Sequence, residues 1–236
     1  MPRKPRKYQI TESLYYHIVN RGVIRQTIFH DKIDAREFIE ILKQYKIREE
    51  TEIYHWCLMG NHYHLVLKLK NPERISKLIG GIQQVYAQYH HKRYHTAGRL
   101  FGSRFKSQVI EDEDYLLVCG RYVERNPVRA KLVKNAWDWA DSSAKYYVSG
   151  KKDKITDKNP QWSDDSSQEY KKWLEKETEE DVELFHGPGT VIKLKGKESK
   201  RLIIDGRIVG HKKGRKTIRP RYNIFRSGEM PSNILE

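Results

Sequence analysis

The pattern of apolar and polar positions divides the first 150 residues into strand-like and helix-like segments. Behind Asp31, apolar residues recur at the spacing of one helical face. Asn71 followed by Pro72 predicts the start of a second helix, because proline suits the first helical turn. A third helix should begin at Asp112 and end at Asn126, since a residue before proline avoids helical backbone angles. Runs rich in aromatic and branched residues predict four strands, over residues 14–20, 52–59, 62–70 and 105–110.

The order of these segments is strand, helix, two strands, helix, strand and a further helix. Only Gly60 and Asn61 separate the two middle strands, a two-residue loop that suits a tight hairpin. We therefore expect an α+β fold of ferredoxin-like type, with a four-stranded antiparallel sheet and two helices on one face. The other face would stay open for a ligand or for the further helix.

The character of the chain changes after this region. Residues 8–150 form the expected main domain, and residues 151–180 are polar enough to predict a linker that contains a short charged helix. Residues 181–236 predict a small β-rich appendage, with strand patterns around an Asp-Gly turn and a densely basic stretch over residues 211–226.

Composition narrows the class of protein. No stretch approaches the roughly 18 apolar residues that a membrane helix needs, and no apolar segment follows the basic N-terminus as in a secretory signal. The two cysteines, Cys57 and Cys119, are too few for a disulfide framework, which fits a cytoplasmic protein. Lysines and arginines outnumber acidic residues by 46 to 31, for a net charge of +15. Such a surplus favours a nucleic-acid partner, although it would also serve a merely solubilising surface.

Two histidines on one strand are the first candidate for chemistry. Side chains alternate between the faces of a strand, so His62 and His64 should project from the same face. Lys68 and Lys70 fall on that face too, which would place a cation site beside a track for phosphates. The alternative is that both histidines are only polar residues on a solvated face.

The third predicted helix carries the second candidate. Tyr115, Cys119, Tyr122 and Asn126 are spaced by four, three and four positions, which aligns them on one helical face. This face could place a nucleophile beside a metal ligand, or the tyrosines could simply pack the helix onto the sheet. One step round the helix stand three arginines that could meet phosphates, namely Arg121, Arg125 and Arg129.

Several motifs in this order resemble a known family. They are His62-Tyr-His64 after Cys57-Leu-Met-Gly-Asn61, then Leu100-Phe-Gly-Ser-Arg-Phe-Lys106, and Arg121-Tyr-Val-Glu-Arg-Asn-Pro-Val-Arg129. Together they resemble the REP-associated tyrosine transposases, relatives of the single-tyrosine HUH transposases, over roughly residues 8 to 150. The remaining C-terminal part resembles no family.

The resemblance implies a metal-dependent endonuclease and strand transferase that acts on single-stranded DNA beside a hairpin, as a homodimer. It implies that His62, His64 and Asn126 hold a divalent metal, Mg²⁺ or Mn²⁺, and that Tyr122 is the nucleophile that forms a 5′-phosphotyrosine. The expected DNA contacts are Lys68, Lys70, Arg104, Lys106, Arg121, Arg125 and Arg129.

Two alternatives share these features. A non-catalytic, domesticated nucleic-acid-binding regulator could use the same sheet, although the usual RNA-binding version presents stacked aromatic residues on its central strands. A replication-initiating HUH nuclease would share the chemistry and act at origins, and the sequence separates it poorly from a transposase.

Overall fold

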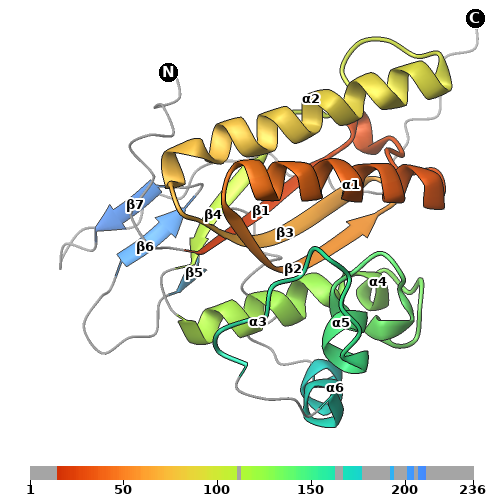
Figure 1. Ribbon diagram of the computed structural model, residues 1–236. Helices are drawn as coiled ribbons and strands as arrows, with labels where there is room; N and C mark the ends of the chain where they lie inside the picture. Colours follow the sequence, from red (N-terminus) through yellow and green to blue (C-terminus); the bar gives the residue numbers. More distant parts are fainter. Residues whose placement is uncertain are drawn as a thin grey trace, which may run out of the picture.

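The computed structural model describes residues 15–110, 113–162 and 167–176, and three short strands between residues 192 and 210. The predicted order of strands and helices is confirmed for the first domain (Figure 1). Its elements are β1 (Tyr15–Arg21), η2 (Val23–Arg25), α1 (Lys32–Arg48), β2 (Thr51–Met59), β3 (His62–Leu69), η3 (Pro72–Arg74), α2 (Ile75–Tyr94), β4 (Lys106–Ile110), α3 (Glu113–Glu124) and α4 (Asn126–Arg129).

The four strands form one antiparallel sheet in the order β2-β3-β1-β4, as a ferredoxin-like fold requires. A later segment covers the outer edge of β2. The amide of Leu58 donates to the carbonyl of Asp141 at 2.9 Å, and that of Ser143 donates to the carbonyl of Trp56 at 3.0 Å. These bonds satisfy backbone groups that an edge strand would otherwise expose.

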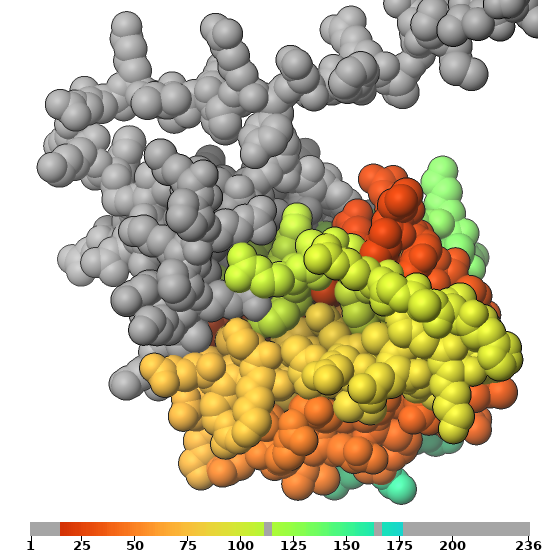
Figure 2. Space-filling view, turned by 90° about the horizontal axis from the view of Figure 1, so that it is seen from above, coloured from red at the N-terminus to blue at the C-terminus, as the bar shows by residue number. Residues whose placement is uncertain are grey.

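Helices α1 and α2 lie side by side on one face of the sheet (Figures 1 and 2). The Asp31 side chain caps α1 by accepting from the amides of Ile33 and Asp34. The apolar face predicted for β3 packs beneath the helices, where Tyr63, Leu65, Leu67 and Leu69 join Phe38 and Leu78 in the main core. No helix in the described part of the chain is both long and apolar enough to span a bilayer.

Helix α3 covers the opposite face, so the face expected to stay open receives the further helix (Figure 1). Leu116, Cys119 and Val123 of α3 pack against Val66 of β3 in a second core. The approach to β2 is close, because a Cβ added at Gly120 would lie 2.4 Å from Nε2 of His55. Helix α3 ends at Glu124, close to the predicted end. Asn126 does not leave the helical region as expected, because it begins α4, with Pro127 in the first turn of that helix.

Residues 151–162 and 167–176 depart from the polar linker expected over residues 151–180. Ile155 and Asn159 are buried, and Tyr170 and Leu174 of α6 (Ser167–Glu175) pack in a third cluster with α5 (Ala144–Ser149) and η4 (Ala136–Asp138). Helix α6 corresponds to the short charged helix predicted there, but it is held by a buried apolar side.

The predicted strand patterns near the C-terminus also appear as strands. Strands β5 (Ile192–Lys193), β6 (Arg201–Ile204) and β7 (Arg207–Gly210) form a second antiparallel sheet in that order. Ile204 pairs with Arg207 across the predicted Asp-Gly turn. The basic stretch over residues 211–226 lies outside the described residues.

Candidate active site

The sheet register gathers the candidate residues on the face that α3 covers. His62 lies opposite Arg21, and Val19 lies between His64 on one side and Lys106 on the other. Directly opposed residues of antiparallel strands share a face of the sheet. His62, His64, Arg21 and Lys106 therefore all lie on the face that α3 covers. From α3 comes Tyr122, whose ring centre lies 5.9 Å from that of His64, while His62 and His64 are 5.1 Å apart.

Burial keeps the histidines of this site neutral. His64 is 5% exposed and His17, its neighbour on β1, is 2% exposed. Burial lowers the pKa of His17 and of His62 to about 4, and holds the pKa of His64 well below its ordinary value. Neutral imidazole is the form that binds a metal, so these groups are ready for that role at neutral pH.

The hydrogen bond of His62 fixes which of its nitrogens could bind a metal. Nδ1 lies 2.6 Å from Oδ1 of Asn61. A carboxamide oxygen only accepts, so Nδ1 carries the proton and Nε2 keeps the lone pair. In His64 it is again Nδ1 that is engaged, at 2.9 Å from Nε2 of His17.

The predicted third ligand, Asn126, is tied to the helix that carries the nucleophile. Its Nδ2 donates to the carbonyl oxygens of Tyr122 and Val123, at 3.0 and 3.1 Å. These bonds use the nitrogen and leave Oδ1 as the atom suited to a cation. Among the described residues no three His, Cys, Asp or Glu side chains cluster as a metal site. Two imidazoles and a carboxamide oxygen, the ligands expected from the sequence, are a donor set that suits a divalent metal.

Tyr122 is buried, with 6% exposed, beneath the guanidinium of Arg129, which lies 4.2 Å from the ring centre. Burial raises the pKa of Tyr122, and the charges of Arg129 and Arg21 act against that rise. Burial has the larger effect, so the phenol is protonated at neutral pH, and the two cationic groups reduce the free-energy cost of ionising it.

Two of the three predicted DNA-binding arginines hold α6. Arg121 Nη1 donates to the carbonyl of Trp173 at 3.5 Å, and Arg125 Nη1 donates to the carbonyls of Leu174 and Glu175 at 2.8 and 3.0 Å. Cations suit a helix C-terminus, where carbonyl groups point outward. Arg129 is the one of the three whose guanidinium lies over Tyr122.

The other predicted DNA contacts are distributed over the sheet. Lys106 is exposed in the same row as His64, and Arg104 is exposed just before it. The ammonium of Lys68 lies 5.3 Å from the ring centre of Tyr15. Lys70 forms an ion pair with Glu50 at the far end of β3.

Sequence reasoning missed three residues of this site, His17, Arg21 and Gln108. His17 and Arg21 are four positions apart on β1, so their side chains point to the same face of the sheet. The register with β3 and β4 brings them beside His62 and His64. The sequence predicts that His17 and Arg21 share a face, but it does not predict which strands pair with β1 or in which register.

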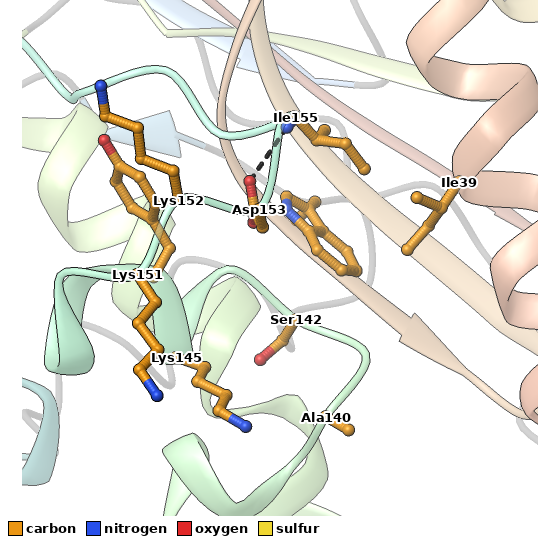
Figure 3. Close-up of a pocket in the computed structure, with 10 residues that line it drawn as sticks. Ile39, Ala140, Ser142, Lys145, Lys151, Lys152, Asp153 and Ile155 are labelled. Atoms are coloured by element: carbon orange, nitrogen blue, oxygen red, sulfur yellow. Dashed lines mark hydrogen bonds between the residues drawn. The ribbon is translucent and has the colours of Figure 1, made fainter.

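A separate pocket of about 280 Å³ lies between α1, β2 and residues 140–155 (Figure 3). Lys145, Lys151 and Lys152 line it, and Asp153 accepts from the amide of Ile155 at 3.0 Å. Neither candidate histidine nor Tyr122 lines this pocket.

Comparison with known proteins places this site in a family. The family model of IS200-like transposases matches residues 10–126, a range that contains both histidines and Tyr122 and ends at Asn126. Through this region the chain belongs to the IS200-like transposase family.

One solved structure shares the fold of this chain. A structure of a REP-associated tyrosine transposase bound to a REP hairpin is 18% identical and has a TM-score of 0.53, covering 71% of this chain and 96% of that one. A candidate transposase from Deinococcus radiodurans R1 is also 18% identical, with a TM-score of 0.36, and covers 52% of this chain and 97% of its own. No curated protein matches the chain.

Proposed function

We propose that this transposase is a metal-dependent endonuclease and strand transferase, and that it acts on single-stranded DNA near hairpins. Tyr122 would be the nucleophile and would form a 5′-phosphotyrosine. The observation that supports this proposal is the contact between the Tyr122 ring and His64, 5.9 Å between centres, within the region that matches the family.

The proposed reaction is a transesterification. The hydroxyl oxygen of Tyr122 attacks the scissile phosphorus while the bond from phosphorus to the 3′ oxygen breaks. The phenol loses its proton and the leaving 3′ oxygen gains one, which gives a phosphotyrosine and a free 3′-hydroxyl. Because one phosphodiester replaces another, the reverse attack by a 3′-hydroxyl can rejoin strands without ATP.

His62 and His64 would hold the metal through Nε2, and Asn126 would hold it through Oδ1. A bound Mg²⁺ or Mn²⁺ would supply positive charge beside the non-bridging oxygens of the phosphate. Arg129, which lies over the Tyr122 ring, would add a second positive charge on the same side.

The DNA would follow a row of basic residues on the same sheet face. We call this row, which consists of Arg21, Lys68, Arg104 and Lys106, the basic rim. Arg21 lies opposite His62, and Lys106 lies in the row of His64, so both can reach phosphates on a strand that passes Tyr122. Arg104 adjoins this row, and Lys68 extends it along β3. The hairpin target is part of the same proposal, supported by the fold shared with the hairpin-bound transposase. The proposed homodimer rests on the family resemblance of the sequence alone.

The test compares cleavage with binding on a hairpin-bearing single strand. His62→Ala should reduce cleavage by at least about 100-fold, because charge stabilisation at the phosphate is a large contribution. Binding, measured by fluorescence anisotropy, should change by only a few-fold because the basic rim is intact. Chelation of the wild type should reproduce the loss, and Mn²⁺ should reverse it.

The control is His95→Ala, at an exposed position beyond α2, which should cleave like the wild type. Undiminished cleavage by a His62, His64 double variant in chelator would contradict the proposal. A protein that binds the hairpin strand but never cleaves it would support the non-catalytic alternative.

A further inference from the structure

His17 links the candidate ligand His64 to a hydrogen-bond acceptor on the neighbouring strand. It is buried on β1, and its ring is nearly parallel to that of His64, with 11° between the planes. Its Nε2 lies 2.9 Å from Nδ1 of His64, and its Nδ1 lies 3.1 Å from Oε1 of Gln108 on β4. The three side chains therefore form a row across β3, β1 and β4.

The chemistry of Gln108 sets the direction of both hydrogen bonds. Its Oε1 can only accept, so Nδ1 of His17 carries a proton. A neutral imidazole has one N–H, so Nε2 of His17 carries a lone pair and accepts from His64. The proton of His64 must then be on Nδ1, which leaves the lone pair on Nε2.

We propose that His17 and Gln108 are positioning residues that fix His64 as the tautomer with its proton on Nδ1. This inference rests on the proposed function, because it treats His64 as a metal ligand. Neither residue touches the metal or the DNA in this account. They act by orienting the ring and by presenting the Nε2 lone pair for coordination.

The hydrogen bonds from Gln108 through His17 to His64 give His64 the same tautomer as His62. Asn61 holds the proton of His62 on Nδ1, and His17 does the same for His64. Both imidazoles then offer Nε2, so no proton has to move before a cation binds. Partners of this kind typically change metal affinity by about 10–100-fold when they are removed.

Nuclear magnetic resonance of the metal-free protein tests the tautomer directly. Two-bond proton–nitrogen correlations should show His64 protonated on Nδ1. In His17→Phe, which cannot accept a hydrogen bond, His64 should shift towards the Nε2–H form that an unconstrained imidazole prefers. His17→Gln should keep the wild-type tautomer, because its carboxamide oxygen can take the place of the accepting Nε2.

Calorimetry with Mn²⁺ alone provides the second measurement. His17→Phe should bind the ion about 10–100-fold more weakly, and His17→Gln should stay within a few-fold of the wild type. If His17→Phe does not fold, Gln108→Leu replaces it. Gln108 is only half-buried, and its loss should leave His64 as a mixture of tautomers.

A wild-type His64 protonated on Nε2 would overturn the proposal. So would an unchanged tautomer and an unchanged Mn²⁺ affinity in both His17→Phe and Gln108→Leu. Neither measurement uses DNA. The proposed role of His17 and Gln108 can therefore be disproved while Tyr122 still forms a covalent adduct with DNA. Conversely, absence of the adduct would remove the proposed function and leave the tautomer of His64 unchanged.

Discussion

Arg129 and Tyr122 contact each other twice. The guanidinium lies 4.2 Å from the centre of the phenol ring, and it also donates a hydrogen bond to the carbonyl oxygen of Tyr122. The contact spans the junction between α3 and α4, where Asn126-Pro127 ends the longer helix. One side chain thus holds the candidate nucleophile and brings positive charge to it.

We predict that Arg129→Ala lowers the rate of covalent attachment to DNA by about 100–1,000-fold, because removing one donor that stabilises the developing charge typically has such an effect. Arg129→Lys should recover only part of the rate, since lysine restores the charge but not the planar group over the ring. Lys134→Ala, at an exposed position nearby, is the matched control. A wild-type rate in Arg129→Ala would show that Arg129 does not assist the attack by Tyr122.

Gly120 and Gly80 form a matched pair for the packing of α3. A Cβ at Gly120 would lie 2.4 Å from His55 Nε2, whereas a Cβ at Gly80 in α2 meets nothing within 4 Å. Gly120→Ala should lower the free energy of unfolding by about 1–3 kcal/mol through overpacking. Gly80→Ala should raise it by about 0.5–1 kcal/mol, because alanine favours a helix. Urea unfolding measures both, and equal effects would mean that α3 does not pack this closely.

The hydroxyl of Tyr170 ties α6 to α3. It donates to Oε2 of the buried Glu124 at 2.8 Å, while Ser143 and His55 bind Oε1 of the same carboxylate. Tyr170→Phe should therefore lower the free energy of unfolding by about 1–3 kcal/mol, the typical loss for a buried group deprived of a partner.

The half-buried Tyr146 provides the comparison, and Tyr146→Phe should be nearly neutral in the same urea titration. An equally neutral Tyr170→Phe would indicate that residues 167–176 behave as the linker expected from their composition.

Stability should fall in mild acid because His17 is buried in its neutral form. Its pKa is about 4 in the folded protein against 6.5 ordinarily, so between these values the unfolded chain binds a proton that the folded chain does not. The contribution of His17 is complete above pH 6.5 and is lost as the pH falls towards 4, on the order of 3 kcal/mol in all. His17→Gln should flatten this dependence, measured by urea unfolding across that range. His95→Gln should leave the pH dependence unchanged. If the free energy of unfolding varied with pH in the same way in His17→Gln and in the wild type, burial of neutral His17 would not be the cause.

The fold was predictable from the sequence because its signals are local. The alternation of Tyr63, Leu65, Leu67 and Leu69 assigns one face of β3 to the main core. The short loop before His62 makes the hairpin, and Pro127 marks the break between α3 and α4. Each of these signals depends on residues close together in the chain.

What was missed depends on distant pairing. His17 lies beside His64 only because β1 pairs with β3, and Arg121 and Arg125 contact α6 from about fifty positions away in sequence. The polar composition of residues 151–180 predicted a linker, yet a few buried side chains such as Tyr170 anchor this segment. Burial of a few residues is enough to order a mostly polar helix, and composition does not report it.

Isolating the covalent complex between protein and DNA tests whether Tyr122 is the nucleophile. Wild-type protein, incubated with Mn²⁺ and a hairpin-bearing single strand, is digested with protease, and mass spectrometry locates the nucleotide-modified peptide. We expect a 5′-phosphotyrosine at Tyr122 in the wild type and in Tyr115→Phe. In Tyr122→Phe we expect no adduct, with binding to the strand retained. An adduct on Tyr115, or an undiminished adduct in Tyr122→Phe, would contradict this expectation.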